Sequence, residues 1–291
     1  MKILNIGSIN LDKSYHVEQF VTAGKTSRAL EHRISFGGKG LNQSVAIARA
    51  GATVWHAGVV GDDGAEIRQF MEKEGVRLDC LATAEGATGH AIIQIDRTGQ
   101  NCILICPGTN NMVSKALVDD ALSKFERDDF LVLQNEVFNV DYAIRRAHEK
   151  GMKIFLNPSP IETSRDIPNI ELVDYLIINE VEGHILTGEH IGQSILAALH
   201  QSFPRSAIVL TLGEKGVLYQ DSRQRLACDA YPTQVKDTTA AGDTFEGYFI
   251  ASLYEGLTVE QALKRASKAS SICISRQGAA LSIPCRKEVD L

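Results

Sequence analysis

Short apolar runs alternate with longer amphipathic stretches along most of this chain. The apolar runs have the length of buried strands, and they fall at residues 2–8, 53–60, 130–134, 153–156, 175–178 and 207–212. Between them, apolar residues recur at helical spacing at residues 41–50, 66–74, 115–125, 141–150 and 195–202. Because strands and helices alternate, the pattern predicts an α/β fold whose mostly parallel central sheet is covered by helices on both faces.

The last part of the chain predicts two further helices, at residues 244–254 and 259–275. Thr258 is a favourable residue for the start of the second helix, and Gly278 is expected to end it. No internal repeat, low-complexity tract or Pro-rich linker interrupts the chain, so the pattern predicts one core domain with an insertion.

Two pairs of short strands form that insertion, because no helix lies between their members. One pair lies at residues 15–20 and 28–36, and the other at 90–96 and 101–105, joined by a hairpin turn at 97–100. We interpret them as a small separate sheet that acts as a lid over a site and pairs with a second subunit in a homodimer. The lid then comprises residues 14–36 and 88–107, and the core comprises residues 1–13, 37–87 and 108–291.

The overall composition is that of a soluble globular protein. Of its 291 residues, 44% are hydrophobic and 23% are charged, which excludes a disordered or fibrous chain. No apolar run approaches the roughly 18 residues of a membrane-spanning helix, and Asp12 interrupts the start before a signal-peptide core forms, so we expect a cytoplasmic protein. The net charge of −6 gives no general attraction to nucleic acid or anionic lipid, and we expect a small molecule as the partner instead.

The six cysteines are scattered, and only Cys102 and Cys106 lie close together, within an alternating apolar stretch. No CxxC motif or histidine-containing ligand cluster accompanies them. We therefore predict buried or half-buried free thiols, with a disulfide or a zinc site as the alternative.

The first of two glycine-rich segments precedes the helix predicted at 41–50, and it reads Gly37-Gly38-Lys39-Gly40-Leu41-Asn42-Gln43. Three glycines in four residues allow the backbone to approach a ligand closely, while Lys39 and Asn42 add a cation and an amide at the helix start. These residues are candidates for ligand binding. The alternative is a flexible turn before a helix.

The second segment precedes the apolar helix at 244–254, and it reads Asp237-Thr238-Thr239-Ala240-Ala241-Gly242-Asp243-Thr244-Phe245. Its Ala-Ala-Gly run supplies unhindered N–H groups at a helix N-terminus, where the macrodipole also favours an anion. Asp243, in the first turn, is placed to accept a proton from a hydroxyl beside a bound phosphate. The alternative is that Asp243 only caps the helix.

Several other functional motifs are missing from the sequence. Gly24-Lys25-Thr26 has the form of a P-loop tail, but Gln19 stands where that motif requires glycine. There is no GxGxxG, GxSxG or HExxH motif and no EF-hand loop. These absences argue against dinucleotide binding, serine hydrolases, zinc proteases and calcium sensors.

Together, GGKGLNQ and DTTAAGDTF resemble the two signature segments of the ribokinase-like (phosphofructokinase-B type) carbohydrate kinases. The resemblance spans essentially the whole chain and is closest to the ribokinase branch. Intermediate landmarks fall in the same order, namely Asn10-Leu11-Asp12, Gln134-Asn135-Glu136, Asn157-Pro158, Asn179-Glu180-Val181-Glu182, Thr211-Leu212-Gly213 and Gly278-Ala279-Ala280. The resemblance implies a three-layer α/β/α core with a small β lid, and transfer of the γ-phosphoryl group of ATP to a sugar hydroxyl.

The resemblance also implies roles at the phosphate end of the site. Asp243 is then the base, and the N–H groups of Ala240, Ala241 and Gly242 hold the charge on the transferred group. Glu182 matches an NxxE element that organises Mg²⁺ through water, although a solvated helix residue is the alternative. The residues implied in nucleotide binding are Asn179, Thr211, Gly213 and Gly216.

The acceptor site implied by the resemblance consists of carboxylates, amides and a glycine backbone. Such groups bind adjacent hydroxyls in a defined geometry and penalise a substrate that lacks them. The matching positions are Asn10, Asp12, Gly38, Lys39, Asn42 and Glu136, together with Asp243. Asp12 and Glu136 have the alternative of being ordinary strand-end charges.

The resemblance further implies a monovalent cation, K⁺ or a similar ion, beside the anion-binding loop. Such an ion would fix the conformation of the loop that carries Asp243 without touching the substrate. The oxygen ligands, most of them backbone carbonyls, would come from Asp237, Thr239, Cys273, Arg276, Gly278 and Ser282.

Two departures from the family pattern concern the edges of the site. Leu41 stands where alanine is frequent, and Ser267 where a residue that stacks on adenine is frequent, so we expect differences at the sugar-pocket edge and the base contact. The sequence predicts an ATP-dependent kinase for the primary hydroxyl of a furanose pentose, D-ribose first. The alternatives are a nucleoside or another sugar as acceptor, and a sugar-binding regulator without catalysis, against which the intact Asp243 argues.

Overall fold

The computed structural model describes residues 1–98, 100–163 and 169–290. In these ranges, nine strands form a central sheet in the order β13-β12-β11-β10-β9-β8-β1-β4-β5. From one edge to the other, the strands are β13 (Arg225–Cys228), β12 (Val217–Gln220), β11 (Ala207–Thr211), β10 (Tyr175–Asn179), β9 (Lys153–Asn157), β8 (Phe130–Gln134), β1 (Ile3–Ile6), β4 (Val54–Val60) and β5 (Arg77–Thr83). Only the pairings of β12 are antiparallel, so the prediction of a mostly parallel sheet is confirmed.

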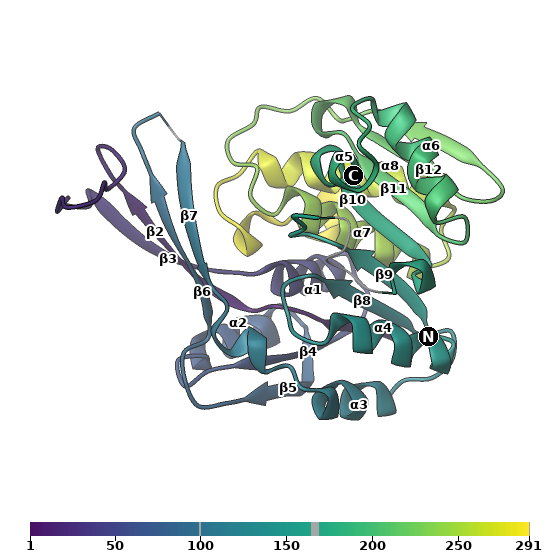
Figure 1. The fold of residues 1–291 in the computed structure, drawn as a ribbon, viewed down its shortest axis with the longest axis horizontal. Coiled ribbons are helices and arrows are strands. Elements are labelled where there is room, and N and C mark those ends of the chain that lie inside the picture. The colour runs from purple at the N-terminus through teal and green to yellow at the C-terminus, as the bar shows by residue number, and fades with distance from the viewer. Residues whose placement is uncertain (99, 164–168, 291) are drawn as a thin grey trace.

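Helices cover both faces of this sheet, which gives three layers (Figure 1). Successive strand residues alternate between two apolar clusters: Ile3 belongs to one and Leu4 to the other, as the two-residue period of a strand requires. The first cluster includes residues of α1 (Lys39–Arg49), α2 (Ala65–Lys73), α7 (Ala241–Tyr254) and α8 (Val259–Ile274). The second includes residues of α3 (Lys115–Ser123), α4 (Val140–Lys150) and α6 (Gly192–Ser202).

Shorter helical elements connect or end these layers. They are α5 (Glu180–Thr187), α9 (Arg286–Val289) and the 3₁₀ turns η1 (Gly108–Met112), η2 (Ile170–Leu172), η3 (Gly213–Lys215) and η4 (Ala280–Ser282). As predicted, Thr258 starts α8, and its side chain forms a capping box with Gln261. The expected stop at Gly278 was wrong, because α8 ends at Ile274, and Gly278 instead donates its N–H to Asp237.

A second sheet projects from the core as a long ribbon (Figure 1). Its order, within the part of the chain that the structure describes, is β3 (Glu31–Gly37), β2 (Asn10–His16), β6 (Gly89–Ile95) and β7 (Asn101–Cys106). The strand predicted at 15–20 was misplaced: β2 starts at Asn10, because its backbone pairs in register with β3 and β6 from that residue onward. The separate sheet itself is therefore present, with one strand starting inside the segment assigned to the core.

The hairpin between β6 and β7 was expected at residues 97–100, of which Gly99 lies outside the described residues. On either side of it, the Asp96 carboxylate accepts hydrogen bonds from the backbone N–H groups of Thr98 and Gln100. The Asp96 N–H donates in turn to the carbonyl of Gln100. These bonds close the chain back on itself between the two strands.

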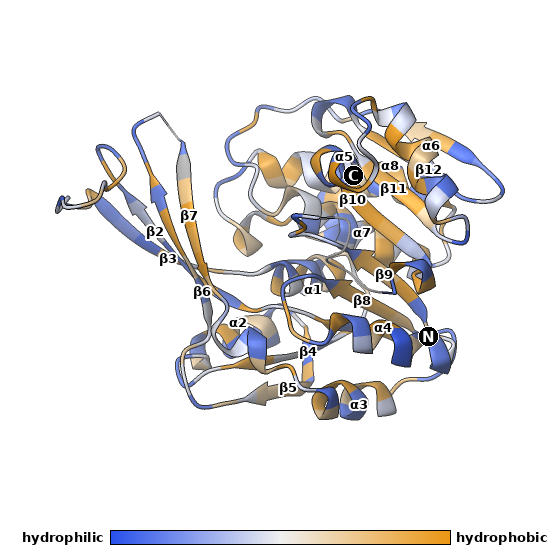
Figure 2. Cartoon of the chain, viewed as in Figure 1, coloured by the Kyte–Doolittle hydropathy of each residue, from blue (hydrophilic) through white to orange (hydrophobic). Residues whose placement is uncertain are grey.

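Apolar side chains concentrate in the strands of the central sheet, but some also lie on the outer lid strands (Figure 2). The exposed lid residues are Ile34, Ile103, Leu104 and Ile105, each at least half accessible to solvent. The register of the four strands places Ile34 and Leu104 on one face of the lid sheet, and Ile103 and Ile105 on the other. No helix in the described part of the chain is long and apolar enough to span a membrane.

Candidate active site

A cavity of about 220 Å³ lies where β9, β10 and β11 end and where α1 and α7 begin. Ligands of open α/β sheets bind at the carboxyl ends of the strands, so its position agrees with the fold. The lining residues are Lys39, Asn157, Ile177, Ile178, Asn179, Glu182, Thr211, Thr238, Ala240, Ala241, Gly242 and Asp243. The cavity therefore brings together both glycine-rich segments and the predicted nucleotide side.

The loop before α7 is shaped by a left-handed residue, since Ala240 has φ +61°. The Ala241 N–H donates to the Thr238 carbonyl at 3.2 Å, so this amide is already engaged. Among the described residues, by contrast, the N–H groups of Ala240 and Gly242 have no protein acceptor. A left-handed residue followed by right-handed ones makes a concave array of amides that suits an anion.

Asp243 is buried, at 6% exposure, in the first turn of α7. Its Oδ2 accepts a hydrogen bond from Asn42 Nδ2 at 2.9 Å, and its Oδ1 accepts one from Gln43 Nε2 at 3.1 Å. In the described structure it makes no capping bond to its own helix, so the alternative of a simple cap is wrong. The two amides fix the carboxylate at the cavity wall instead.

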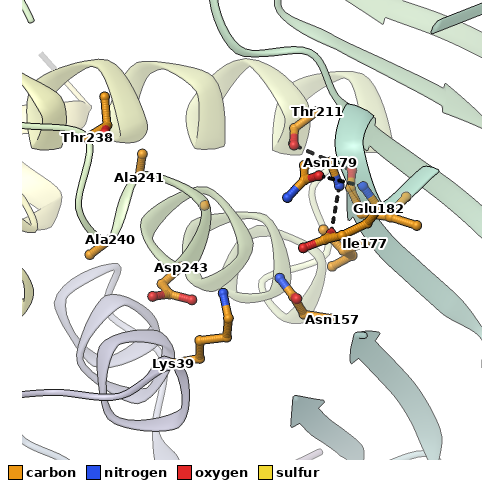
Figure 3. A pocket seen from close by; sticks show the side chains of 12 residues that line it. Lys39, Asn157, Ile177, Asn179, Glu182, Thr211, Thr238, Ala240, Ala241 and Asp243 are labelled. Carbon is orange, nitrogen blue, oxygen red and sulfur yellow. Dashed lines mark hydrogen bonds between the residues drawn. The ribbon is translucent and has the colours of Figure 1, made fainter. Parts of the chain in front are cut away.

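The start of α1 is tightly packed, which excludes the alternative of a flexible turn. Gly38 has φ +87°, and a Cβ atom on Gly40 would lie 2.4 Å from the backbone nitrogen of Ser8. Glycine is suited to the positive φ at Gly38, and only glycine, which has no Cβ, permits the close approach at Gly40. The Lys39 side chain is thereby directed into the same space as Asp243, as Figure 3 shows.

Lys39 is the cation of this site. Burial disfavours its ammonium group, but four nearby carboxylates outweigh that cost and raise the pKa of Lys39. In order of their effect, the carboxylates are Asp243, Glu136, Glu182 and Glu246. Lys39 is therefore held as a positive charge that faces the wall formed by Asp243.

The predicted acceptor residues gather beside the start of α1. Glu136 Oε2 accepts hydrogen bonds from Ser8 Oγ at 2.5 Å and from the Lys39 N–H at 3.0 Å. Burial raises the pKa of Glu136, and burial together with the charge of Glu136 raises the pKa of Asp12 to about 6. Because both carboxyls are withdrawn from water and interact with each other, the alternative of ordinary strand-end charges does not hold.

The other acceptor candidates are engaged by neighbours. Asn10 Oδ1 accepts a hydrogen bond from Asn110 Nδ2 at 2.8 Å, and Asn42 holds Asp243. A Cβ atom on Gly38 would lie 3.1 Å from the Asn10 nitrogen, so the two segments touch. The structure thus places all predicted acceptor residues around one corner of the cavity, although only Lys39 and Asp243 line it directly.

Only some of the candidate residues for nucleotide and Mg²⁺ binding lie at the cavity. Asn179 and Thr211 line the cavity, and Asn179 Oδ1 caps α5 by accepting the Glu182 N–H at 2.9 Å. Glu182 Oε2 accepts the Asn179 N–H at 3.0 Å in return, and Glu182 is 7% exposed, so it is not a solvated helix residue. Gly213 and Gly216 lie outside the cavity lining, and a Cβ on Gly216 would be 2.1 Å from the Cys228 carbonyl oxygen.

These residues fit a hydrated Mg²⁺ at the position of Glu182. Its Oε2 is used by the capping box, whereas the rest of the carboxylate lines the cavity opposite Lys39. Mg²⁺ prefers oxygen ligands and keeps several waters, so one carboxylate and the phosphates of a nucleotide are a suitable set. The described residues contain no cluster of three or more His, Cys, Asp or Glu side chains that could hold a metal by themselves.

The candidates for a monovalent cation surround the loop before α7. Burial alone would raise the pKa of Asp237. Hydrogen bonds from Thr239 and from the Gly278 N–H outweigh burial and lower that pKa, so the Asp237 carboxylate is charged. Cys273 Sγ lies 3.0 Å from Ser282 Oγ and 3.7 Å from the Thr239 carbonyl oxygen. The charge and the carbonyl oxygens suit a large monovalent ion better than a thiol-bound metal.

Arg276 belongs to this group through its backbone only. Its N–H donates to the Cys273 carbonyl, while its guanidinium pairs with Glu288 at 2.5 Å, away from the loop. All six cysteines of the chain lie in the described ranges and are free thiols, as predicted, but the prediction that they are buried or half-buried is wrong for Cys102 and Cys285, which are exposed. Cys273 is thus one of two buried free thiols, with Cys80.

Several site residues were missed by the reasoning from sequence. Gln43 and Glu246 are fully buried beside Asp243, and Asn157 joins them from the end of β9. Glu246 offered a signal, because it is a charged residue in an otherwise apolar helix, one turn after Asp243. Gln43 and Asn157 stood in recognised segments, but their pairing comes only from the fold.

The two departures from the family pattern lie behind the site. Leu41 is fully buried in the core, so its side chain does not form the pocket edge where a difference was expected. Ser267 is nearly buried on α8, with its Oγ 3.9 Å from Cys228 Sγ. Neither side chain lines the cavity.

Comparison with known proteins agrees with this geometry. Residues 1–286 match the model of the pfkB family of carbohydrate kinases. The chain is 35% identical to a ribokinase of Schizosaccharomyces pombe, over 100% of this chain and 97% of that protein. It resembles the crystal structure of ribokinase from Cryptococcus neoformans in complex with ADP, with 31% identity, a TM-score of 0.89 and coverage of 99% and 98%.

A second solved structure agrees with the first. Ribokinase from Arabidopsis thaliana, complexed with ribose and ATP, is 28% identical with a TM-score of 0.87, covering 99% of this chain and 97% of that one. The family match spans nearly the whole chain, and the fold and the two signature segments agree with it. This chain therefore belongs to the pfkB family of carbohydrate kinases, which are phosphotransferases with an alcohol group as acceptor.

Proposed function

We propose that this protein transfers the γ-phosphoryl group of ATP to the primary hydroxyl of D-ribose, giving ribose 5-phosphate and ADP. The observation that carries the proposal is the pairing of Asp243 with Lys39 across a cavity that begins at the N-terminus of α7. Asp243 is a buried carboxylate held by two amides, beside backbone N–H groups that are free to bind an anion. This is the set of groups that phosphoryl transfer to a hydroxyl requires.

The acceptor corner supports a polyhydroxylated substrate. It holds two interacting carboxyls, Asp12 and Glu136, and the amides of Asn10 and Asn42, all within a small volume around Gly38. Carboxylates and amides discriminate strongly in favour of a substrate that supplies the matching hydroxyls. The similarity to ribokinases, one of them solved with ribose and ATP, supports ribose as that substrate.

In the proposed reaction, the Asp243 carboxylate takes the proton of the acceptor hydroxyl as its oxygen attacks the γ-phosphorus. A new O–P bond forms, the bond between the γ-phosphorus and the bridging oxygen breaks, and ADP leaves with the electron pair. The N–H groups of Ala240 and Gly242, with Lys39 on the opposite side, stabilise the charge that spreads over the transferred group. The Ala241 N–H joins them only if it exchanges its bond to Thr238.

We propose two ions for this reaction. Mg²⁺, organised through water by Glu182, neutralises charge on the phosphates of ATP. K⁺ or a similar ion is held at Asp237 and the neighbouring carbonyls, where it stiffens the loop from Thr239 to Asp243.

Asn179 and Thr211 contact the nucleotide from the cavity wall. The positions of Gly213 and Gly216 outside the lining favour a role in shaping the turn after β11. Their contact with the nucleotide stays a prediction, which applies to the part of ATP that extends beyond the cavity.

The lid is proposed to close over the acceptor and to pair with the lid of a second copy. The exposed residues Ile34 and Leu104 lie on one face of the lid sheet, and Ile103 and Ile105 lie on the other, so such a dimer would bury one of these two pairs. We propose residues 14–36 and 88–107, extended by the start of β2 at Asn10, as this lid, and the cytoplasm as the site of action.

The proposed function is tested by a coupled ATP-consumption assay over ribose, 2-deoxyribose, fructose, fructose 6-phosphate, adenosine and pseudouridine, each with K⁺ or Na⁺. Ribose is expected to give the highest kcat/KM, with stimulation by K⁺ and with ribose 5-phosphate identified by its phosphorus resonance. Turnover of a nucleoside only, or failure to phosphorylate any of these acceptors, would contradict the proposal.

A further inference from the structure

A buried amide links the two carboxyls of α7 below the cavity. Gln43 Nε2 donates one hydrogen bond to Asp243 Oδ1 and one to Glu246 Oε2, each at 3.1 Å. Glu246 Oε2 also accepts from Asn157 Nδ2 at 3.0 Å. Gln43 and Glu246 are both completely buried, so water does not compete for these bonds.

The other end of the Gln43 amide is held by a row of buried polar side chains. Gln43 Oε1 accepts from Gln134 Nε2 at 2.5 Å, and Gln134 Nε2 also donates to Asn5 Oδ1 at 3.0 Å. Asn5 Nδ2 donates to Ser44 Oγ at 2.9 Å, and Ser44 Oγ lies 2.8 Å from His56 Nδ1. All of these residues are buried to 0% exposure, although they come from α1, β1, β4 and β8.

Two backbone carbonyls decide which way every amide in this row points. The Gly7 carbonyl, 3.2 Å from His56 Nε2, can only accept, so Nε2 carries the proton and Nδ1 accepts from the Ser44 hydroxyl. Burial lowers the pKa of His56 to about 4, which keeps the ring neutral and this arrangement intact. The Gly40 carbonyl, 2.8 Å from Asn5 Nδ2, fixes the Asn5 amide in the same sense.

The orientation then passes from one amide to the next. With its nitrogen facing Gly40, Asn5 must present its oxygen to Gln134, whose nitrogen therefore faces both Asn5 and Gln43. Gln43 must in turn present its nitrogen to the carboxyls of α7. The reverse orientation would set an amide oxygen against Asp243 and lose the bond from Gln134.

We propose that Gln43 is a positioning residue for the proposed base Asp243, and that the buried row from Gln134 to His56 holds the Gln43 amide in the one orientation that serves it. Gln43 does not reach the cavity, whose lining includes Asp243 and Asn157 but not Gln43. It acts on the reaction only through the direction of the Asp243 carboxylate. The inference rests on the proposed role of Asp243.

Glu246 completes the clamp as an acceptor. Burial raises its pKa well above the usual range, and its Oε1 has no partner among the described residues. Its Oε2 accepts hydrogen bonds from both Gln43 and Asn157, so it anchors the Gln43 amide. A glutamine at 246 keeps an oxygen acceptor at this place, whereas a leucine removes it.

The direct test is Gln43→Met, which keeps the side-chain length and removes the two hydrogen bonds to the carboxyls of α7 together with the one accepted from Gln134. We expect kcat with ribose to fall roughly 10- to 100-fold while the KM values for ribose and ATP stay within about twofold, because misaligning a catalytic group affects the reaction step. The matched control is Gln220→Met, the same change at a glutamine of β12, far along the sheet. It is expected to leave kcat unchanged. An unchanged kcat in Gln43→Met would overturn the proposal.

A double-mutant cycle with Asp243→Asn separates this inference from the proposed function. If Gln43 acts through Asp243, adding Gln43→Met to Asp243→Asn lowers the residual kcat by less than about twofold further. A full additional 10- to 100-fold loss would show a general structural effect and overturn the inference. An Asp243→Asn variant that keeps the normal kcat would instead overturn the proposed role of Asp243.

A second pair of variants covers the case in which Gln43→Met does not fold. Gln134→Met leaves Gln43 in place but frees its amide to rotate, and we expect kcat to fall about 3- to 10-fold with both KM values unchanged. Glu246→Gln should lose less kcat than Glu246→Leu, because glutamine keeps the oxygen acceptor. If Gln134→Met folds with the parent kcat, or if Glu246→Gln is as impaired as Glu246→Leu, the proposed row does not position Asp243.

Discussion

The site is formed where two helix N-termini meet, and the two are built by opposite means. The start of α1 carries a cation, Lys39, and no acidic residue in its first turn. The start of α7 carries a carboxylate, Asp243, and free backbone N–H groups. The helix dipole favours the second arrangement and opposes the first.

The difference shows that Lys39 is placed by the site and not by its helix. Burial disfavours its ammonium group, but four carboxylates around it outweigh that cost and raise its pKa. At α7, the helix dipole favours a negative charge, and the amides of Asn42 and Gln43 donate hydrogen bonds to the Asp243 carboxylate. Lys39 and Asp243 therefore place a positive and a negative side chain across one cavity. This arrangement suits a reaction that moves a proton and an anionic group in opposite directions.

The backbones of the two starts differ as well. Both use a residue with positive φ, Gly38 with φ +87° and Ala240 with φ +61°, but only Ala240 is in the left-handed helical conformation. At Gly38, a Cβ would meet Asn10 and Ser8 at 3.1 Å, so glycine is needed for space as well as for φ. At Ala240 there is room for a Cβ, and the left-handed conformation costs about 1 kcal/mol.

Among the variants that test this comparison, Lys39→Met is expected to show the largest change, a loss of kcat/KM. Without the ammonium group, nothing on the α1 side balances the charge of the transferred group, and kcat/KM for ribose should fall roughly 100-fold. Steady-state kinetics with Lys264→Met, which removes an exposed lysine paired with Glu260, supplies the control. A loss of less than threefold would mean that the cation is not part of the reaction.

Asp12→Asn tests the charge that the α1 side must bury. The folded pKa of Asp12, about 6, exceeds the ordinary value of 3.8, so the folded state holds the proton more tightly and stability falls as pH rises between these values. Asp12→Asn removes this cost and should be about 2 kcal/mol more stable than the parent at pH 8, with the gain vanishing near pH 4. Urea unfolding at both pH values measures the difference, with the exposed Asp79→Asn as the control. A gain that persists at pH 4 would contradict this cause.

Gly38→Ala should destabilise the protein by about 1 to 3 kcal/mol. The added Cβ meets the backbone of the neighbouring strand and also imposes strain at positive φ. Gly242→Ala, at the other helix start, adds a Cβ where nothing lies within 4 Å and φ is ordinary, and the higher helix propensity of alanine should raise the stability by about 0.5 to 1 kcal/mol. Equal losses in thermal unfolding would remove the distinction between the two starts.

Ala240→Gly has the smallest expected effect and the opposite sign. Removing the Cβ relieves the left-handed conformation, and the free energy of unfolding should rise by about 0.5 to 1 kcal/mol. Its neighbour Ala241→Gly, inside the helix, should instead lower it by a similar amount. If both glycine variants are destabilised, the strain assigned to Ala240 is absent.

Most of the core could be predicted from the sequence, because its strands and helices have strong apolar periodicity. Phe130–Gln134 was predicted to the residue, whereas β12 and both edge strands, β13 and β5, were missed. For β12 and β13, four residues give too little pattern. The start of β2 was missed because Asn10, Asp12 and Lys13 are polar on both faces, and backbone pairing with two neighbours decides its length. Strand ends that are set by partners do not show in local sequence.

The candidate site divides in the same way. Asp243 and Lys39 could be identified because each stands in a glycine-rich segment with recognisable chemistry. The clamp of Gln43, Glu246 and Asn157 could not, because it joins three elements that are far apart in the chain. Only the fold shows that these three side chains share one buried position.

The central claim is that Asp243 serves the reaction step and not the binding of the substrates. The measurement that tests it most directly is Asp243→Asn, with calorimetric titration of ribose and ATP beside the turnover assay. We predict that both ligands bind within a few-fold of the parent affinity, while kcat falls by about 100-fold or more. Turnover within threefold of the parent would contradict the claim.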